Sequence, residues 1–146
     1  MRRLVVDASV WVELLTSDRS ASWSARLRGD ELHVPALCDI EVAACLQRGT
    51  CAPAARAALA HYSTVPLHRH AHLPLLPRIH ELRHWMPAAD ACYVALAEAL
   101  EATFLTRDAQ LGRTVRAIGT VPCERVGRQS LRMLPRRATA SSRQRR

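Results

Sequence analysis

The chain has 146 residues, a length that suits one domain with a hydrophobic core of its own. It carries a formal net charge of +8, and all 21 of its basic residues are arginine. The lack of lysine excludes a P-loop, whose lysine holds phosphate, and excludes enzymes that form a lysine Schiff base. Arginine binds phosphate through a two-pronged fork, so the charge is compatible with a polyanionic partner but does not demonstrate one.

The five cysteines are odd in number and show no C-x-x-C spacing. Several fall in apolar runs, which predicts reduced, buried thiols in a cytoplasmic protein. Asp7 and Glu13 interrupt the apolar stretch near the amino terminus, which argues against a cleaved signal peptide. No uncharged run approaches the roughly 18 residues that a membrane span requires, so we expect no membrane association.

Apolar runs and helix-forming composition predict short strands that alternate with helices. In chain order the predicted elements are a strand over 4–6, helices over 9–15 and 21–28, a strand over 32–34, helices over 38–48 and 53–61, a strand over 64–67, helices over 75–83 and 88–100, a strand over 103–106, a helix over 108–113 and a last strand within 121–126.

This alternation is typical of a parallel sheet covered on both faces. The expected fold class is therefore α/β, a three-layer α/β/α sandwich with a short central parallel sheet. We expect this domain to span residues 1–134. Residues 135–146 contain mainly Arg, Ser, Thr and Ala, and this composition predicts a basic, disordered tail.

Four acidic residues stand in apolar surroundings. Asp7 follows the run at 4–6, Glu41 lies inside the helical run at 40–44, Asp90 opens another helix, and Asp108 follows the strand at 103–106. Acidic side chains are rarely buried unless they are paired or hold a metal. Ligands of open parallel sheets bind beyond the carboxyl ends of the strands, so we expect Asp7, Asp90 and Asp108 at one edge.

Two of these interpretations have alternatives. Asp90 and Asp108 each stand where a helix could begin, so either could serve as an N-cap. The helix around Glu41 is apolar on nearly every side, so periodicity does not choose between Glu41 and Asp39.

Four segments together resemble the PIN domain. They are VVDAS at 5–9, IEV at 40–42, DACYVALAE at 90–98 and LTRD at 105–108. Each motif is short, but their order, spacing and the total length fit, and the likeness runs from about residue 3 to about residue 126. Within the family, the chain is most similar to the VapC-type toxins of bacterial and archaeal toxin–antitoxin pairs.

The resemblance implies a metal-dependent endoribonuclease, the toxin of a type II toxin–antitoxin system. It implies that Asp7, Glu41, Asp90 and Asp108 form the acidic quartet, which selects Glu41 over Asp39. Ser9 and Thr106 match hydroxyls that commonly support such a site. The resemblance also implies an RNA substrate, a small antitoxin protein as partner, and a homodimer.

The chemistry of the acidic residues is consistent with this function. Ligands that offer only oxygen favour Mg²⁺, with Mn²⁺ as an alternative, over zinc or copper. Such an ion could activate a water for attack on an RNA phosphodiester bond. We expect Asp7 and Asp90 to be direct ligands. Asp108 would complete the site or hold a second ion, and Glu41 would orient the attacking water or share the metal.

Two other functions remain open at this stage. One is a PIN-like RNA-binding module that has lost catalysis, although a pure binder gains nothing from buried like charges. The other is a metal-dependent phosphohydrolase that acts on small molecules.

The histidines offer a separate hypothesis. His68, His70 and His72 would share one face of a strand, where they could bind zinc or nickel. The alternative is a solvated polar segment between helices.

Overall fold

Five short parallel strands form the centre of the molecule. The computed structural model describes residues 1–17 and 27–127. Its sheet has the order β3-β2-β1-β4-β5, and every neighbouring pair is parallel. The strands are β1 (Arg3–Val6), β2 (Glu31–Pro35), β3 (His68–His70), β4 (Thr103–Thr106) and β5 (Cys123–Arg125).

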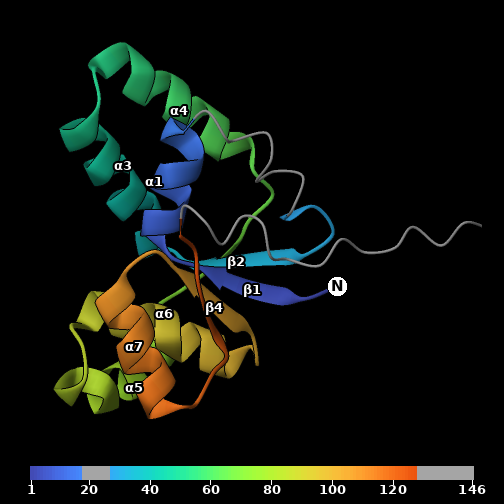
Figure 1. Ribbon diagram of the computed structural model, residues 1–146, viewed down its shortest axis with the longest axis vertical. Helices are drawn as coiled ribbons and strands as arrows, with labels where there is room; N and C mark the ends of the chain where they lie inside the picture. Colours follow the sequence, from blue (N-terminus) through green and yellow to red (C-terminus); the bar gives the residue numbers. More distant parts are fainter. Residues whose placement is uncertain (18–26, 128–146) are drawn as a thin grey trace, which may run out of the picture.

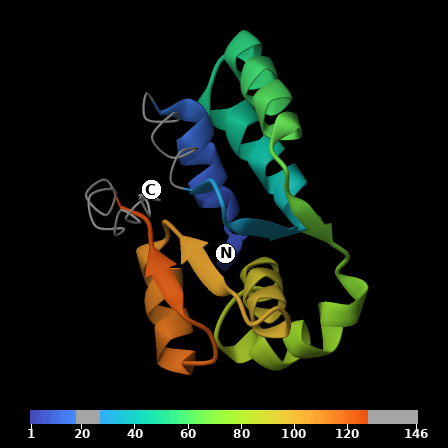
Figure 2. The same cartoon turned by 90° about the vertical axis from the view of Figure 1, so that its right-hand side faces the viewer.

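Helices cover both faces of this sheet. Figures 1 and 2 show α1, α3 and α4 on one side and α5, α6 and α7 on the other. Their bounds are α1 (Ala8–Thr16), α3 (Leu37–Gly49), α4 (Ala52–Thr64), α5 (Leu76–Glu81), α6 (Ala88–Ala99) and α7 (Ala109–Ile118), with short 3-10 turns η1 (Leu73–Leu75) and η2 (Leu82–His84) on either side of α5. The predicted three-layer α/β/α sandwich is confirmed.

The core lies along β1 and α6, the central strand and the helix that crosses it. Leu4, Val5 and Val6 are fully buried, as a strand covered on both faces must be. Every residue of α6 from Ala91 to Ala97 is also buried. The last three residues of β1 are therefore apolar and buried, and Asp7 is the first ionisable residue after them.

The third strand is not where the sequence predicts it. We expected a strand over 64–67, but α4 continues to Thr64 and the strand is His68–His70. This strand lies at the edge of the sheet, where Val34 of β2 is in register with Arg69. Backbone pairing stabilises such an edge strand without an apolar face, so its position leaves no hydrophobic pattern in the sequence.

The helix after β4 is longer than predicted. We expected it to end at Arg113, and it continues to Ile118. Gly119 ends it with a left-handed backbone, at a φ of 72°, which glycine adopts without steric cost. The predicted helix over 21–28 falls mostly outside the described residues, and the predicted tail at 135–146 lies wholly outside them.

The cysteines and helices bear on two further expectations. All five thiols are free; Cys38 and Cys92 are buried, as predicted, whereas Cys51 is exposed. Across residues 1–17 and 27–127, no helix combines the length and the apolar character that crossing a bilayer demands.

Candidate functional site

The four acidic residues reach one edge of the sheet from four different elements. The connections that follow β1 and β4 diverge, toward β2 and β3 on one side and toward β5 on the other. The carboxyl ends of β1 and β4 thus form the switch point of the sheet, where open α/β sheets bind ligands. Asp7 directly follows β1, and Asp108 follows β4 by two residues.

Asp7 is held by two hydroxyl groups. The residue is 8% exposed, and its Oδ2 accepts hydrogen bonds from Ser9 Oγ at 2.6 Å and Thr106 Oγ1 at 2.8 Å. The same two hydroxyls accept backbone N–H bonds, Ser9 from Arg107 at 3.2 Å and Thr106 from Asp108 at 3.1 Å. This network joins the ends of β1 and β4, so the orientation of Asp7 is set by both strands.

Asp90 carries the clearest electrostatic signature of the cluster. Burial, followed by the negative charges of Asp7, Glu41 and Asp108, raises its pKa to about 6. All three other acids of the predicted quartet therefore act on Asp90 through space. The structure thus places the other three carboxylates within electrostatic reach of Asp90, although the four are spread over 102 positions of the chain, from 7 to 108.

Glu41 projects from α3 toward this cluster and is held by a tyrosine. The Tyr93 hydroxyl of α6 donates a hydrogen bond to Glu41 Oε2. Burial and the charge of Asp7 raise the pKa of Glu41, whereas the Tyr93 hydrogen bond lowers it. Tyr93 was not predicted as a site residue from the sequence. A signal was present, because a tyrosine inside the apolar run of a buried helix requires a partner for its hydroxyl.

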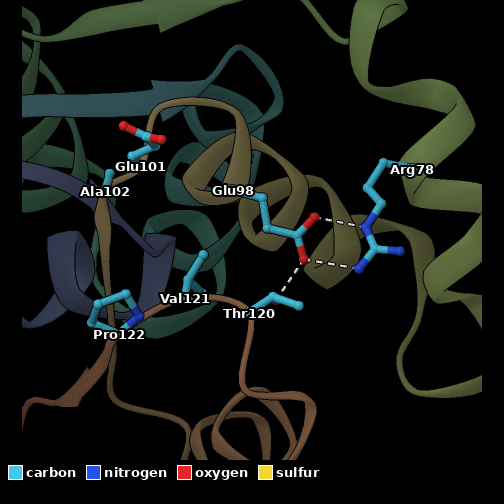
Figure 3. A pocket seen from close by; sticks show the side chains of 7 residues that line it. All are labelled: Arg78, Glu98, Glu101, Ala102, Thr120, Val121 and Pro122. Atoms are coloured by element: carbon cyan, nitrogen blue, oxygen red, sulfur yellow. Dashed lines mark hydrogen bonds and ion pairs between the residues drawn. The ribbon is translucent and has the colours of Figure 1, made fainter.

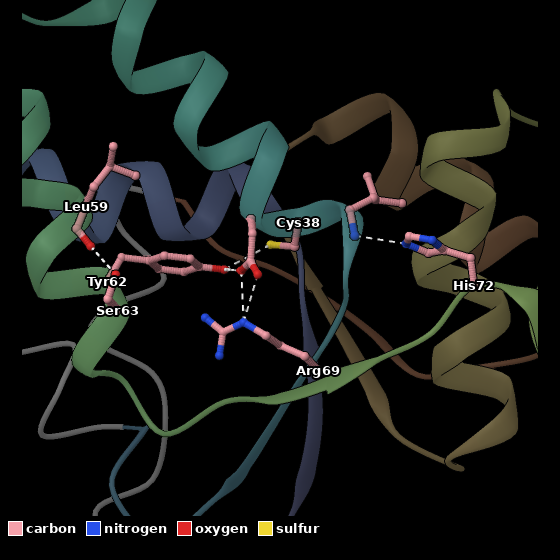
Figure 4. Close-up of polar contacts among 8 residues, drawn as sticks. Cys38, Leu59, Tyr62, Ser63, Arg69 and His72 are labelled. Atoms are coloured by element: carbon pink, nitrogen blue, oxygen red, sulfur yellow. Dashed lines mark hydrogen bonds and ion pairs between the residues drawn. The ribbon is translucent and has the colours of Figure 1, made fainter.

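Asp39, two residues before Glu41, has different partners. Its carboxylate accepts hydrogen bonds from the Tyr62 hydroxyl at 2.9 Å and from Arg69 Nε at 2.9 and 3.1 Å (Figure 4). Arg69 therefore neutralises Asp39. The alternative that periodicity left open is thus resolved in space, since Glu41 faces the acids and Asp39 faces a cation.

Helix capping explains one acid and not another. Asp108 is the N-cap of α7, and its Oδ1 accepts from the backbone N–H groups of Gln110 at 2.8 Å and Leu111 at 3.0 Å. The capping alternative for Asp90 is wrong. Pro87 occupies the N-cap of α6, and Asp90 is the third residue of the helix, with no side-chain cap bond.

The acids receive little compensation from nearby cations. Among residues 1–17 and 27–127, no ion pair involves Asp7, Glu41, Asp90 or Asp108. Arg107, beside Asp108 in sequence, pairs instead with Glu13 of α1 at 2.6 Å. This pair could not be predicted from the sequence, because it depends on how α1 lies against β4.

The donor set fits a hard divalent cation. Four carboxylates lie at one edge, and burial together with the repulsion of the other three raises the pKa of Asp90. In the part of the chain that the structure describes, no three His, Cys, Asp or Glu side chains converge closely enough to enclose a metal ion. Mg²⁺ does not require such an enclosure, since it keeps several waters and commonly binds one or two carboxylates directly.

The histidines are arranged differently from the prediction. His72 lies beyond β3, and its Nε2 accepts the Leu37 N–H at 2.9 Å (Figure 4), so the three predicted imidazoles do not share a strand face. A ring that we did not consider, His33 of β2, stacks on His68 with centroids 4.8 Å apart and lies 3.0 Å from His70, Nδ1 to Nε2. Strand register brought these rings together, since His33 is opposite His68.

A hollow of about 500 Å³ lies at the opposite edge of the sheet, where the segments before β4 and β5 meet α5 and α6. Figure 3 shows its main polar feature, a two-pronged pair between Arg78 and Glu98 at 2.6 and 3.0 Å. Thr120 also donates to Glu98, at 2.6 Å. Arg78 therefore neutralises the charge of Glu98, whereas the four acids of the predicted quartet form no ion pair among the described residues.

The molecule thus belongs to the class of three-layer α/β proteins with an acidic site at the strand ends. Residues 4–117 match the family model of the PIN domain. The chain therefore belongs to the PIN domain family.

Curated relatives and solved structures agree with this assignment. The chain is 40% identical to ribonuclease VapC3 and 32% identical to ribonuclease VapC12, both of Mycobacterium tuberculosis. Each alignment covers 76% of this chain, with 86% of VapC3 and 91% of VapC12.

Two solved structures share the fold. VapBC2 of Rickettsia felis, bound to a DNA fragment from its promoter, aligns with a TM-score of 0.67 at 12% identity, over 86% of this chain and 99% of that one. A toxin–antitoxin complex from Klebsiella pneumoniae aligns with a TM-score of 0.59 at 16% identity, over 81% and 94% of the two chains.

Proposed function

We propose that this chain is a metal-dependent endoribonuclease and the toxin of a type II toxin–antitoxin pair. The observation that carries the proposal is the cluster of four carboxylates at the switch point, none of them in an ion pair among the described residues. The names of the relatives, ribonucleases VapC3 and VapC12, support RNA as the substrate. The net charge of +8 is compatible with a polyanion.

Asp7 and Asp90 would hold the ion directly, with Asp108 and Glu41 beside them. Mg²⁺ is the proposed cofactor, and Mn²⁺ would substitute for it because it accepts the same oxygen ligands. When bound, the ion would supply an acidified water and neutralise charge at the scissile phosphate.

The residues around the ion have separate tasks in this proposal. Ser9 and Thr106 fix one oxygen of Asp7 through their hydroxyls, and its other oxygen would bind the ion. Glu41 accepts a proton from the attacking water or orients it, because its raised pKa makes it a better base than an ordinary glutamate. Asp108 accepts the capping hydrogen bonds of α7 with its Oδ1, and its Oδ2 would serve the site.

The partners are part of the same proposal. A small antitoxin protein would bind this chain and hold it inactive, as the toxin–antitoxin complex among its structural neighbours suggests by name. We further propose a homodimer that acts in the cytoplasm.

The test is cleavage of total cellular RNA by the purified chain with Mg²⁺, with Mn²⁺ and with EDTA. We expect fragments with either ion and none with EDTA. Asp7→Asn should lower the cleavage rate by about 10²–10³-fold, since a lost metal ligand costs several kcal/mol of transition-state stabilisation. Asp39→Asn is the matched control, because it changes a neutralised carboxylate on the same helix as Glu41, and its rate should be unchanged.

Each outcome separates the proposed function from the alternatives. An Asp7→Asn variant that cleaves as fast as the parent would contradict the site. RNA binding without cleavage under any ion would favour the inactive binding module. Hydrolysis of small phosphate esters without RNA cleavage would favour the phosphohydrolase.

A further inference from the structure

The acids of the cluster differ in what holds them in place. Two hydroxyls fix Asp7, and two backbone N–H groups fix Asp108. Glu41 has a longer side chain with more rotatable bonds, and it is half-buried on α3. Its carboxylate receives one hydrogen bond from the described residues, from the hydroxyl of Tyr93. The conformation of Glu41 therefore depends on one donor.

Tyr93 is a rigid donor. Its side chain is fully buried, and its ring lies against Phe104 of β4, with centroids 6.2 Å apart. It stands three residues after Asp90 on α6, so both project from the same face of that helix. The hydroxyl consequently links α6, which carries one proposed ligand, to α3, which carries Glu41.

We infer that Tyr93 is a positioning residue that holds the Glu41 carboxylate toward Asp7 and Asp90. This inference rests on the proposed function, and it adds a residue whose hydroxyl touches neither the RNA nor the ion. Without that hydroxyl, Glu41 would rotate among several conformers, and only a fraction of molecules would have all four acids in place.

The chain contains a matched control for this role. Tyr62 is also buried, and its hydroxyl also donates to a carboxylate of α3, that of Asp39. Both tyrosine hydroxyls also contact the Cys38 thiol. The two tyrosines therefore differ mainly in the carboxylate that they hold, one within the acidic cluster and the other beside Arg69.

The experiment compares Tyr93→Phe with Tyr62→Phe in RNA cleavage under Mg²⁺. Each substitution removes one hydroxyl and keeps the ring. Tyr93→Phe should lower kcat by about 10- to 100-fold, the effect typical of residues that orient a metal site from outside it, with KM within about twofold. Tyr62→Phe should leave kcat within about twofold. Thermal unfolding of both variants verifies that each is folded.

A double-mutant cycle separates positioning from general support of the fold. If Tyr93 acts through Glu41, then Tyr93→Phe should have no further effect on kcat in a Glu41→Ala background. A structural role would instead give additive losses. Calorimetric titration with Mn²⁺ alone provides a readout without catalysis, in which Tyr93→Phe and Glu41→Ala should weaken the affinity to a similar extent and the double variant no further.

The outcomes distinguish this inference from the proposed function. If the parent chain cleaves RNA or binds Mn²⁺, and Tyr93→Phe matches it in kcat and in Mn²⁺ affinity, Tyr93 has no positioning role while the proposed function stands. If the losses in kcat from Tyr93→Phe and Glu41→Ala add in the double variant, the positioning role of Tyr93 is likewise contradicted and the proposed function stands. A parent chain that neither cleaves RNA nor binds Mn²⁺ overturns the proposed function and the role of Tyr93 with it.

Discussion

An acidic cluster and a histidine cluster lie at two places on the sheet, and they differ in whether their side chains are charged at neutral pH. At the carboxyl ends of β1 and β4, burial and neighbouring acids raise the pKa of Asp90 to about 6, so it is still mostly ionised at pH 7. On β2 and β3, burial and neighbouring imidazoles lower the pKa of His33, and burial and His68 lower that of His70. The two histidine rings are therefore neutral at pH 7.

The difference shows why only one of the two clusters requires an ion. A histidine cluster relieves its repulsion by releasing protons, because the ordinary pKa of imidazole is already near 6.5. A carboxylate cluster keeps its charge at neutral pH, even with a raised pKa. Its repulsion is relieved by a cation. The described arginines form no ion pair with these four acids, and Arg107, which precedes Asp108 in sequence, is paired with Glu13.

The largest expected effect is stabilisation of the acidic cluster by metal. Mn²⁺ at about a hundredfold excess over its Kd should raise the free energy of unfolding by about 2.7 kcal/mol, because it binds the folded chain and not the unfolded one. Asp7→Asn should be slightly more stable than the parent without metal and should respond little to Mn²⁺. Thermal unfolding with and without Mn²⁺ measures both. An equal Mn²⁺ response in parent and variant would place the ion elsewhere.

Asp108 allows its two tasks to be separated. Asp108→Ala should lower the free energy of unfolding by about 1 kcal/mol, because α7 loses its N-cap. Asp108→Asn should retain most of that stability, since asparagine also caps well. Both variants should lose RNA cleavage to a similar degree, because both lack the carboxylate. If Asp108→Asn cleaves like the parent, Asp108 is a cap and nothing more.

Asp90 should make the metal-free protein less stable at neutral pH. Its pKa is higher in the folded chain than the ordinary 3.8, so the folded state binds its proton more tightly than the unfolded state does. Stability from this group is therefore present below about pH 4 and is lost as pH rises through about 6. Asp90→Asn should be more stable at pH 7.5, by on the order of 1 kcal/mol after solvent screening.

The measurement is thermal unfolding in EDTA between pH 4 and pH 8. The advantage of Asp90→Asn should shrink as the pH falls below 6, because the parent carboxyl then becomes neutral as well. A constant difference across this range would mean that the charge of Asp90 is not the cause.

The histidines should respond to pH in the opposite sense. His33 and His70 bind protons less readily in the folded chain than at their ordinary pKa of 6.5. Their contribution to stability is complete above about pH 6.5 and declines as the pH falls below it, since the unfolded state then binds more protons. Glu31, 3.7 Å from His33 Nε2, opposes this effect only in part.

His33→Leu should therefore reduce the loss of stability between pH 7 and pH 5. The comparison is best made in the Asp90→Asn background, where the acidic cluster contributes less of the pH dependence. His80→Leu changes an exposed histidine of α5 and should keep the parent slope. If the Asp90→Asn protein and its His33→Leu and His80→Leu derivatives lose stability equally between pH 7 and pH 5, the histidine cluster on β2 and β3 does not cause that loss.

Much of the fold and half of the site geometry could be predicted from the sequence. The runs at 4–6 and 104–105 are short, apolar and buried, which is the pattern of central parallel strands. An acid directly after such a strand has only one edge of the sheet to occupy, because all parallel strands end there. Asp7 and Asp108 could be placed on this basis without knowledge of any contact between them.

Contacts between residues that are distant in sequence could not be predicted. Asp39 and Glu41 look alike in a helix that is apolar on most sides, and they are distinguished by Arg69 and Tyr93, which lie 30 and 52 residues away from them. The edge strand His68–His70 likewise exists because its backbone pairs with β2. The pattern of apolar residues in the sequence predicts whether a side chain will be buried. Its contacts with residues of other elements depend on how the layers of the fold pack.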